Sequence, residues 1–174
     1  MFTSRLAALS SRLDDFAPRV QNLAPFLARL VFGQAFLLTG IGKLRNLDRT
    51  ASFFAQLGIP YPEANAVFVG GVEAVGGTLI VLGLFTRPLT VLLSAVMVVA
   101  IATADRQAFF ASLIPGGEPG LTSVAPAIFL LTLLSLFAGG PGAWSLDAWL
   151  ARRAGRLPAD ALTGAVVSSR SWRL

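Results

Sequence analysis

The chain has 174 residues and a net charge of +5 at pH 7. Apolar residues make up 55% of it and charged residues 13%, whereas soluble domains are roughly 45–50% apolar and about 25% charged. This composition indicates a protein of the lipid bilayer, and the basic residues flank apolar runs without forming a basic stripe, which argues against a nucleic-acid partner.

The first 22 residues predict an amphipathic segment on the membrane surface, because leucines at helical spacing alternate there with charged residues. An apolar run then starts at Leu23. No small-residue cleavage site follows this run, which ends instead at the charged flank Lys43-Leu44-Arg45. We therefore expect a retained membrane span rather than a removable signal peptide.

Residues 23–150 predict a four-span membrane domain. Four windows reach the roughly 17–25 apolar residues that cross a hydrocarbon core, and they cover residues 23–42, 66–85, 88–104 and 121–138. Each must be helical to satisfy its own backbone. The predicted fold is all-α, an integral membrane four-helix bundle with short interfacial helices.

The segments between the spans differ in kind. Thr86-Arg87 is so short that the second and third spans must form an antiparallel hairpin. Residues 44–65 predict a short interfacial helix followed by an extended turn, and residues 105–120 a turn on the membrane surface. Pro126 predicts a kink in the fourth span.

The chain after the fourth span is expected at the membrane surface. Trp144 and Trp149 suit an aromatic belt, and Asp147 is expected to cap the terminal helix. Residues 151–174 form a basic tail. Basic residues near the spans favour cytoplasmic termini: Arg5, Arg12, Arg19, Arg87, Arg152, Arg153 and Arg156 on that side, against Lys43, Arg45, Arg49 and Arg106 on the other.

Two charged residues, Arg29 and Glu73, fall inside apolar spans. A charge at that depth costs at least about 2.5–3.5 kcal/mol on insertion scales. Each lies on a stripe with glycines that allow close helix packing. The first stripe is Arg29, Gly33, Phe36, Gly40 and Lys43, and the second is Gly70, Glu73, Gly77 and Ile80.

Packing the two stripes together would remove Glu73 from lipid. In the expected register Glu73 lies level with Leu37, with Lys43 and Arg29 each on the order of 10 Å away in depth. Gln34 and Thr39 lie at heights that allow hydrogen bonds to the carboxylate. Two interpretations are open: an ion pair that fixes helix register, or a ligand or proton site.

The sequence resembles the DoxX family. The resemblance rests on Arg29…Gly33…Gly40-Ile41-Gly42-Lys43, on Leu57-Gly58-Ile59-Pro60, on Glu73-Ala74-Val75-Gly76-Gly77, on Gly83-Leu84-Phe85-Thr86-Arg87 and on residues 140–147. It implies a small bacterial inner-membrane protein, multi-pass and redox-linked, since the namesakes are associated with terminal oxidase and thiosulfate:quinone oxidoreductase systems. It also implies that Arg29, Lys43 and Glu73 are the family's recurring charged positions.

Three functions follow as hypotheses. The first is a redox-associated subunit that binds quinone or quinol, or docks a soluble or membrane oxidoreductase. Since the chain has no Cys and no His, we expect no covalent cofactor, no thiol relay and no metal site of those ligands. The second is a non-enzymatic scaffold or assembly protein, and the third a small transporter, which needs a homo-oligomer. The sequence does not decide whether the chain is an enzyme.

Overall fold

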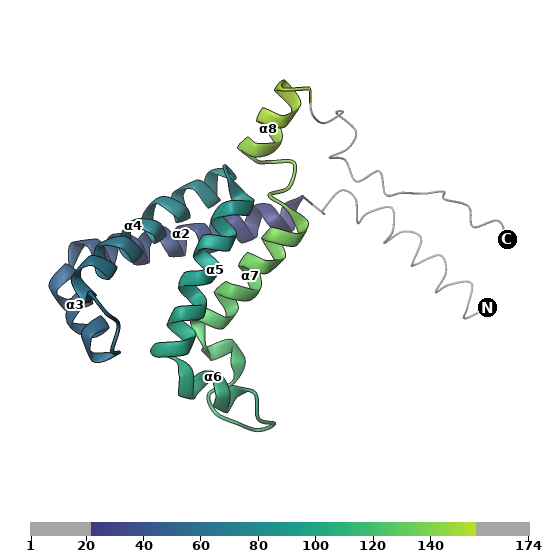
Figure 1. Ribbon diagram of the computed structural model, residues 1–174. Helices are drawn as coiled ribbons and strands as arrows, with labels where there is room; N and C mark the ends of the chain where they lie inside the picture. Colours follow the sequence, from purple (N-terminus) through teal and green to yellow (C-terminus); the bar gives the residue numbers. More distant parts are fainter. Residues whose placement is uncertain (1–21, 156–174) are drawn as a thin grey trace, which may run out of the picture.

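The computed structural model describes residues 22–155, and this part of the chain is helical without strands (Figure 1). The predicted amphipathic segment before Asn22 and most of the basic tail lie outside the described residues. The helices are α2 (Leu23–Arg45), α3 (Leu47–Gln56), α4 (Pro62–Leu82), α5 (Thr86–Thr103), α6 (Arg106–Ser112), the 3₁₀ turn η1 (Leu121–Ser123), α7 (Ala125–Gly139) and α8 (Leu146–Arg153).

Three helices, α2, α4 and α5, are long and apolar enough to cross a membrane. The fourth apolar helix, α7, has 15 residues, a length of about 22 Å against a hydrocarbon core of about 30 Å. The predicted window 121–138 was too long at its start, because η1 occupies residues 121–123 and α7 begins beyond it. Pro126 lies in the first turn of α7, where its missing N–H costs nothing, so it starts the helix instead of kinking it.

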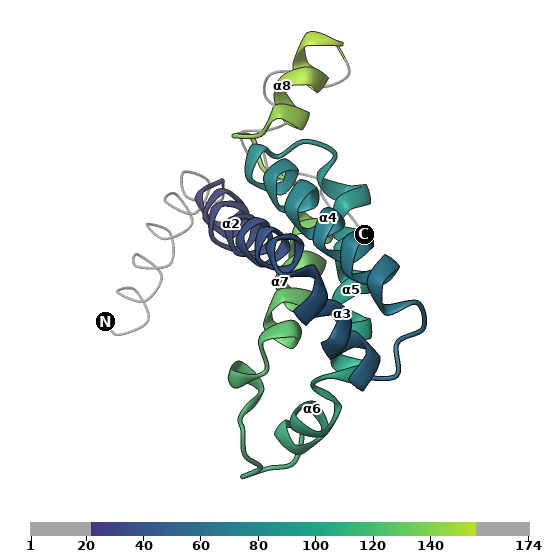
Figure 2. The same cartoon turned by 90° about the vertical axis from the view of Figure 1, so that its left-hand side faces the viewer.

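The helices form two pairs that cross. α2 packs along α4, and α5 packs along α7; Figures 1 and 2 show the α2–α4 pair lying across the α5–α7 pair. The buried core lies where the pairs meet and takes residues from all four helices, namely Phe36, Ile80, Leu93, Met97, Leu133 and Leu136.

Glycines let the backbones of α2 and α4 touch. A methyl group on Gly33 would lie 2.9 Å from the carbonyl oxygen of Gly77, and one on Gly77 would lie 2.6 Å from the carbonyl oxygen of Gly33. A methyl group on Gly40 would lie 2.7 Å from the carbonyl oxygen of Gly70. The four glycines predicted to pack these helices therefore lie at their interface, as small residues do in membrane helix pairs.

The first turn of α8 holds the turn between α4 and α5. The carboxylate of Asp147 accepts hydrogen bonds of 2.9 Å from both Phe85 N and Thr86 N, and Asp147 N donates to Gly83 O at 2.9 Å. Asp147 was expected to help cap α8 and does lie in its first turn, but its carboxylate makes these bonds to the α4–α5 turn instead of a capping bond to α8. Ser145 caps α8 by accepting from Ala148 N, while Asp147 places its negative charge at the N-terminus of α5, where the helix dipole favours it.

One end of the bundle holds both the start of α2 and the segment after α7. Ala143 N donates to Asn22 Oδ1 at 3.0 Å, joining residues 121 positions apart. α8 lies at this end, whereas α3 lies at the far end of the α2–α4 pair and α6 at the far end of the α5–α7 pair (Figure 1). The candidate site described below lies away from α8, on the side of the bundle that includes α3.

The glycine interface predicts that Gly40→Ala destabilises the protein while Gly42→Ala does not. Gly40 meets the backbone of α4, whereas a methyl group on Gly42 meets nothing within 4 Å. Overpacking costs about 1–3 kcal/mol, and alanine at an open helical site gains up to about 1 kcal/mol. Detergent-induced unfolding followed by circular dichroism measures both changes, and equal effects of the two substitutions would contradict the packing.

Candidate functional site: an ion pair on an apolar pocket

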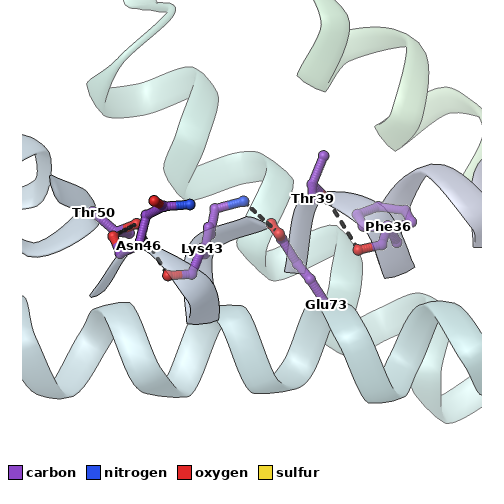
Figure 3. Close-up of polar contacts among 6 residues, drawn as sticks. All are labelled: Phe36, Thr39, Lys43, Asn46, Thr50 and Glu73. Atoms are coloured by element: carbon purple, nitrogen blue, oxygen red, sulfur yellow. Dashed lines mark hydrogen bonds and ion pairs between the residues drawn. The ribbon is translucent and has the colours of Figure 1, made fainter. Parts of the chain in front are cut away.

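An ion pair joins α2 to α4. Lys43 Nζ donates to Glu73 Oε2, and the two side chains point toward one another in Figure 3. Glu73 is only 3% exposed, while the Lys43 side chain keeps 27% of its surface. Lys43 belongs to the last turn of α2, where the helix dipole also favours a cation. The carboxylate is thus buried and paired, while the lysine side chain is partly exposed.

The glycine contacts shift the register from the one expected. Gly77, and not Glu73, lies against the backbone of Leu37. Because the helices are antiparallel, Glu73 lies one turn, or about 6 Å, nearer to Lys43 and further from Arg29 than predicted. Backbone contact between glycines sets this register, and a charge-based alignment of the two stripes could not have found it.

Arg29 therefore does not flank Glu73, and this part of the predicted site is wrong. Its guanidinium donates to Val81 O at 3.4 Å and to Trp144 O. Its side chain also fills the space beside Gly83, so that a methyl group there would collide with Arg29. Arg29, at 1% exposure, instead ties α2 to the end of α4 and to the segment before α8.

The two uncharged residues predicted near the carboxylate make no bond to it. Gln34 is exposed. Thr39 donates its hydroxyl to Phe36 O at 3.0 Å, within its own helix (Figure 3). Thr39 nevertheless lines the same pocket as Lys43 and Glu73. Of these two uncharged residues, only Gln34 does not line the pocket.

The ion pair lies in the wall of a pocket of about 490 Å³ between the two helix pairs. Ligand pockets typically measure about 300–1,000 Å³ and are mostly apolar with a few polar groups. The wall here follows that pattern. It comprises Phe36, Thr39, Lys43, Phe53, Phe54, Leu57, Ile59, Asn65, Phe68, Val69, Glu73, Leu92, Ala95, Val96, Met97, Val99, Ala100, Thr103, Ala104, Asp105, Ala125, Pro126 and Phe129.

The aromatic side of this pocket was not predicted from the sequence. Residues 44–65 were expected at the membrane surface, but α3 and the turn after it contribute Phe53, Phe54, Leu57 and Ile59 to the wall. Phe54 is buried. A signal was available, since apolar residues at 53, 54 and 57 share one helical face, but only the tertiary structure shows what that face covers.

The ion pair offers both kinds of hydrogen-bonding group to the pocket. Within residues 22–155, Lys43 Nζ makes one hydrogen bond, and Glu73 Oε1 accepts none. An ammonium has three donors, and a carboxylate has two oxygens. One ligand oxygen can therefore accept from Lys43 while a ligand hydroxyl donates to Glu73.

Comparison with known proteins places the chain in a family. The family model named DoxX matches residues 24–106, which include α2 to α5 and thus both members of the ion pair. The membrane protein Rv3486 of Mycobacterium tuberculosis is 40% identical over 135 residues, covering 72% of this chain and 80% of the relative. The chain belongs to the DoxX family.

Two further relatives of this DoxX protein match over shorter stretches. A Bacillus subtilis protein named "Putative oxidoreductase CatD" is 31% identical over 51% of this chain and 65% of its own. The inner membrane protein YphA of Escherichia coli is 39% identical over 38% of this chain and 47% of its own. No solved structure matches the DoxX chain.

The buried pair predicts strong energetic coupling between Lys43 and Glu73. Lys43→Met leaves a buried carboxylate without its partner, which costs about 3–5 kcal/mol in a fully buried pair and less here because Lys43 is partly exposed. Adding Glu73→Gln should restore at least about 1 kcal/mol of the loss. When Glu73→Gln is also made alone, the three variants and the unaltered protein form a double-mutant cycle. The free energy of unfolding of each in detergent gives the coupling energy.

A second cycle serves as the control. Glu63 lies in the first turn of α4 and is exposed, so Glu63→Gln and Lys43→Met should have additive effects. Additive effects in the Lys43 and Glu73 cycle as well would show that the pair contributes nothing to stability.

Proposed function

We propose that this DoxX protein is a redox-associated membrane subunit that binds quinone or quinol in the pocket beside Lys43 and Glu73. The observation that carries the proposal is the combination of an apolar cavity of about 490 Å³ with one buried carboxylate and one ammonium in its wall. The helices around it include three that are apolar enough to cross a membrane, so the cavity suits a lipid-soluble ligand that carries polar oxygens.

Each part of such a ligand has a matching part of the wall. A ring carbonyl accepts a hydrogen bond from Lys43, and a ring hydroxyl donates to Glu73. Phe36 and Phe129 stack edge to face at 4.9 Å between ring centroids, and Phe54 also lines the pocket. These rings provide apolar surfaces for the ligand ring.

A bound quinone supplies the chemistry of two-electron carriers, and the protein supplies binding and positioning. The chain has no Cys and no His, so we propose that electrons come from an oxidoreductase partner. The name of the Bacillus subtilis relative, "Putative oxidoreductase CatD", supports the redox association but names no partner.

The second candidate is a scaffold without a ligand. The observation in its favour is that Lys43 and Glu73 lie next to the contact between Gly40 and Gly70, where an ion pair also fixes helix register. The two candidates differ in one measurable respect, since only the first requires the pocket to bind a small molecule.

Binding of a short-chain ubiquinone or of menadione, each in its oxidised and its reduced form, to the purified protein tests the proposal. We expect Glu73→Gln to weaken quinol binding about tenfold, the loss of one charge-assisted hydrogen bond. Glu63→Gln, an exposed change on the same helix, should leave the Kd unchanged. Equilibrium dialysis in detergent or nanodiscs measures the Kd values.

A substitution that fills the pocket provides a second, independent test of quinone binding. Ala100 lines the pocket, whereas Ala102 is exposed and does not. Ala100→Phe should therefore abolish binding of quinone and quinol alike, and Ala102→Phe should not. If the unaltered protein binds neither ligand, the scaffold function is the better account.

We also propose that the protein lies in the bacterial plasma membrane as a multi-pass protein with both termini cytoplasmic. The contact between Asn22 and Ala143 supports termini on one side, and Arg87, Arg152 and Arg153 belong to that end. A fluorescent protein fused at the C-terminus should fluoresce, and alkaline phosphatase inserted after Gly116 should be active. The reverse pattern would invert the topology.

A further inference from the structure

A second concavity lies at the end of the bundle opposite the pocket. It has a volume of about 400 Å³ and lies between α8 and the end of α4. Its wall consists of Leu82, Ala143, Trp144, Ser145, Leu146, Trp149 and Arg152. Trp144 is 57% exposed and Trp149 is 42% exposed. We call this concavity the α8 groove.

The α8 groove lies at the level of a membrane boundary. Leu82 is the last residue of α4, one of the three helices that can cross a membrane. Tryptophan is enriched at the interface between hydrocarbon and headgroups, where its apolar ring and its N–H both find suitable surroundings. Two tryptophans beside the end of a spanning helix therefore indicate contact with the headgroup region.

The groove has a cationic rim. Arg152 lines it and is exposed. The acidic residue of the adjoining segment, Asp147, already accepts hydrogen bonds from Phe85 N and Thr86 N. The next basic residue, Arg153, instead stacks on the Trp149 ring at 4.1 Å and does not line the groove. Among residues 22–155, Arg152 is thus the basic residue that lines the groove.

We propose that the α8 groove binds one anionic phospholipid from the surrounding bilayer. The phosphate pairs with Arg152, since a guanidinium binds phosphate oxygens with two parallel hydrogen bonds. The glycerol and the first part of an acyl chain lie along Trp144, Trp149 and Leu82. Charge complementarity and the position at the end of α4 favour this occupant. The proposal is independent of the quinone pocket at the other end of the bundle.

Native mass spectrometry of the full chain, titrated with phosphatidylglycerol or phosphatidylcholine in detergent, tests the proposal. We expect one phosphatidylglycerol to bind more tightly than phosphatidylcholine. Arg152→Gln should weaken phosphatidylglycerol binding about tenfold, the equivalent of one charge-assisted hydrogen bond. Arg152→Lys should restore part of it, because the charge returns without the bidentate geometry.

Arg153→Gln is the matched control, since it removes the same charge from the adjacent position, and Arg153 does not itself line the groove. It should change phosphatidylglycerol affinity less than twofold. If it weakens binding as much as Arg152→Gln, the attraction is a general property of the basic surface, and the groove is not a site. Equal affinity of the unaltered protein for the two lipids would also overturn the proposal. Unfolding curves of each variant in detergent confirm that they are folded.

Discussion

Backbone contact between α2 and α4 sets the geometry of this protein. At Gly33, Gly40 and Gly77 the two helices approach so closely that no side chain fits between them. In lipid no hydrophobic effect drives helices together, so close van der Waals packing has to do it. The contact also fixes which residues face each other, because glycine pairs tolerate no sliding. The position of every charged group on these helices follows from that register.

The register separates two charges that the sequence places in similar settings. Glu73 faces Lys43 at the end of α2, while Arg29 reaches the far end of α4 and the segment before α8. Glu73 therefore lines a pocket, whereas Arg29 joins three segments of the chain and is buried between them. The two sites lie at different ends of the bundle. At one end Asp147 holds the turn between α4 and α5, and at the other end a cavity lies between the helix pairs.

The sequence predicted much of the helical framework, for identifiable reasons. Long apolar windows specified α2, α4 and α5 because a backbone in lipid must be helical. Glycine spacing specified the α2–α4 interface. The link predicted at Thr86-Arg87 was misplaced, because α4 ends at Leu82 and α5 begins at Thr86, and these two helices pack mainly on other partners, α4 along α2 and α5 along α7. Two predictions from single residues were wrong, because a proline and a carboxylate each suit more than one position near a helix N-terminus. Pro126 starts α7 instead of kinking it, and Ser145, not Asp147, makes the capping bond of α8.

By itself the sequence determined that the protein belongs to the lipid bilayer, that it is all-helical and which family it resembles. These properties depend on composition, periodicity and motif order along the chain. It also named Lys43 and Glu73 as candidates, since a buried carboxylate in an apolar run requires a partner. Only the tertiary structure decided which base that partner is, because the choice rests on a shift of one helical turn. It alone also showed that α3 and α5 enclose a pocket beside the pair, since a cavity depends on how helices cross and leaves no pattern in the sequence.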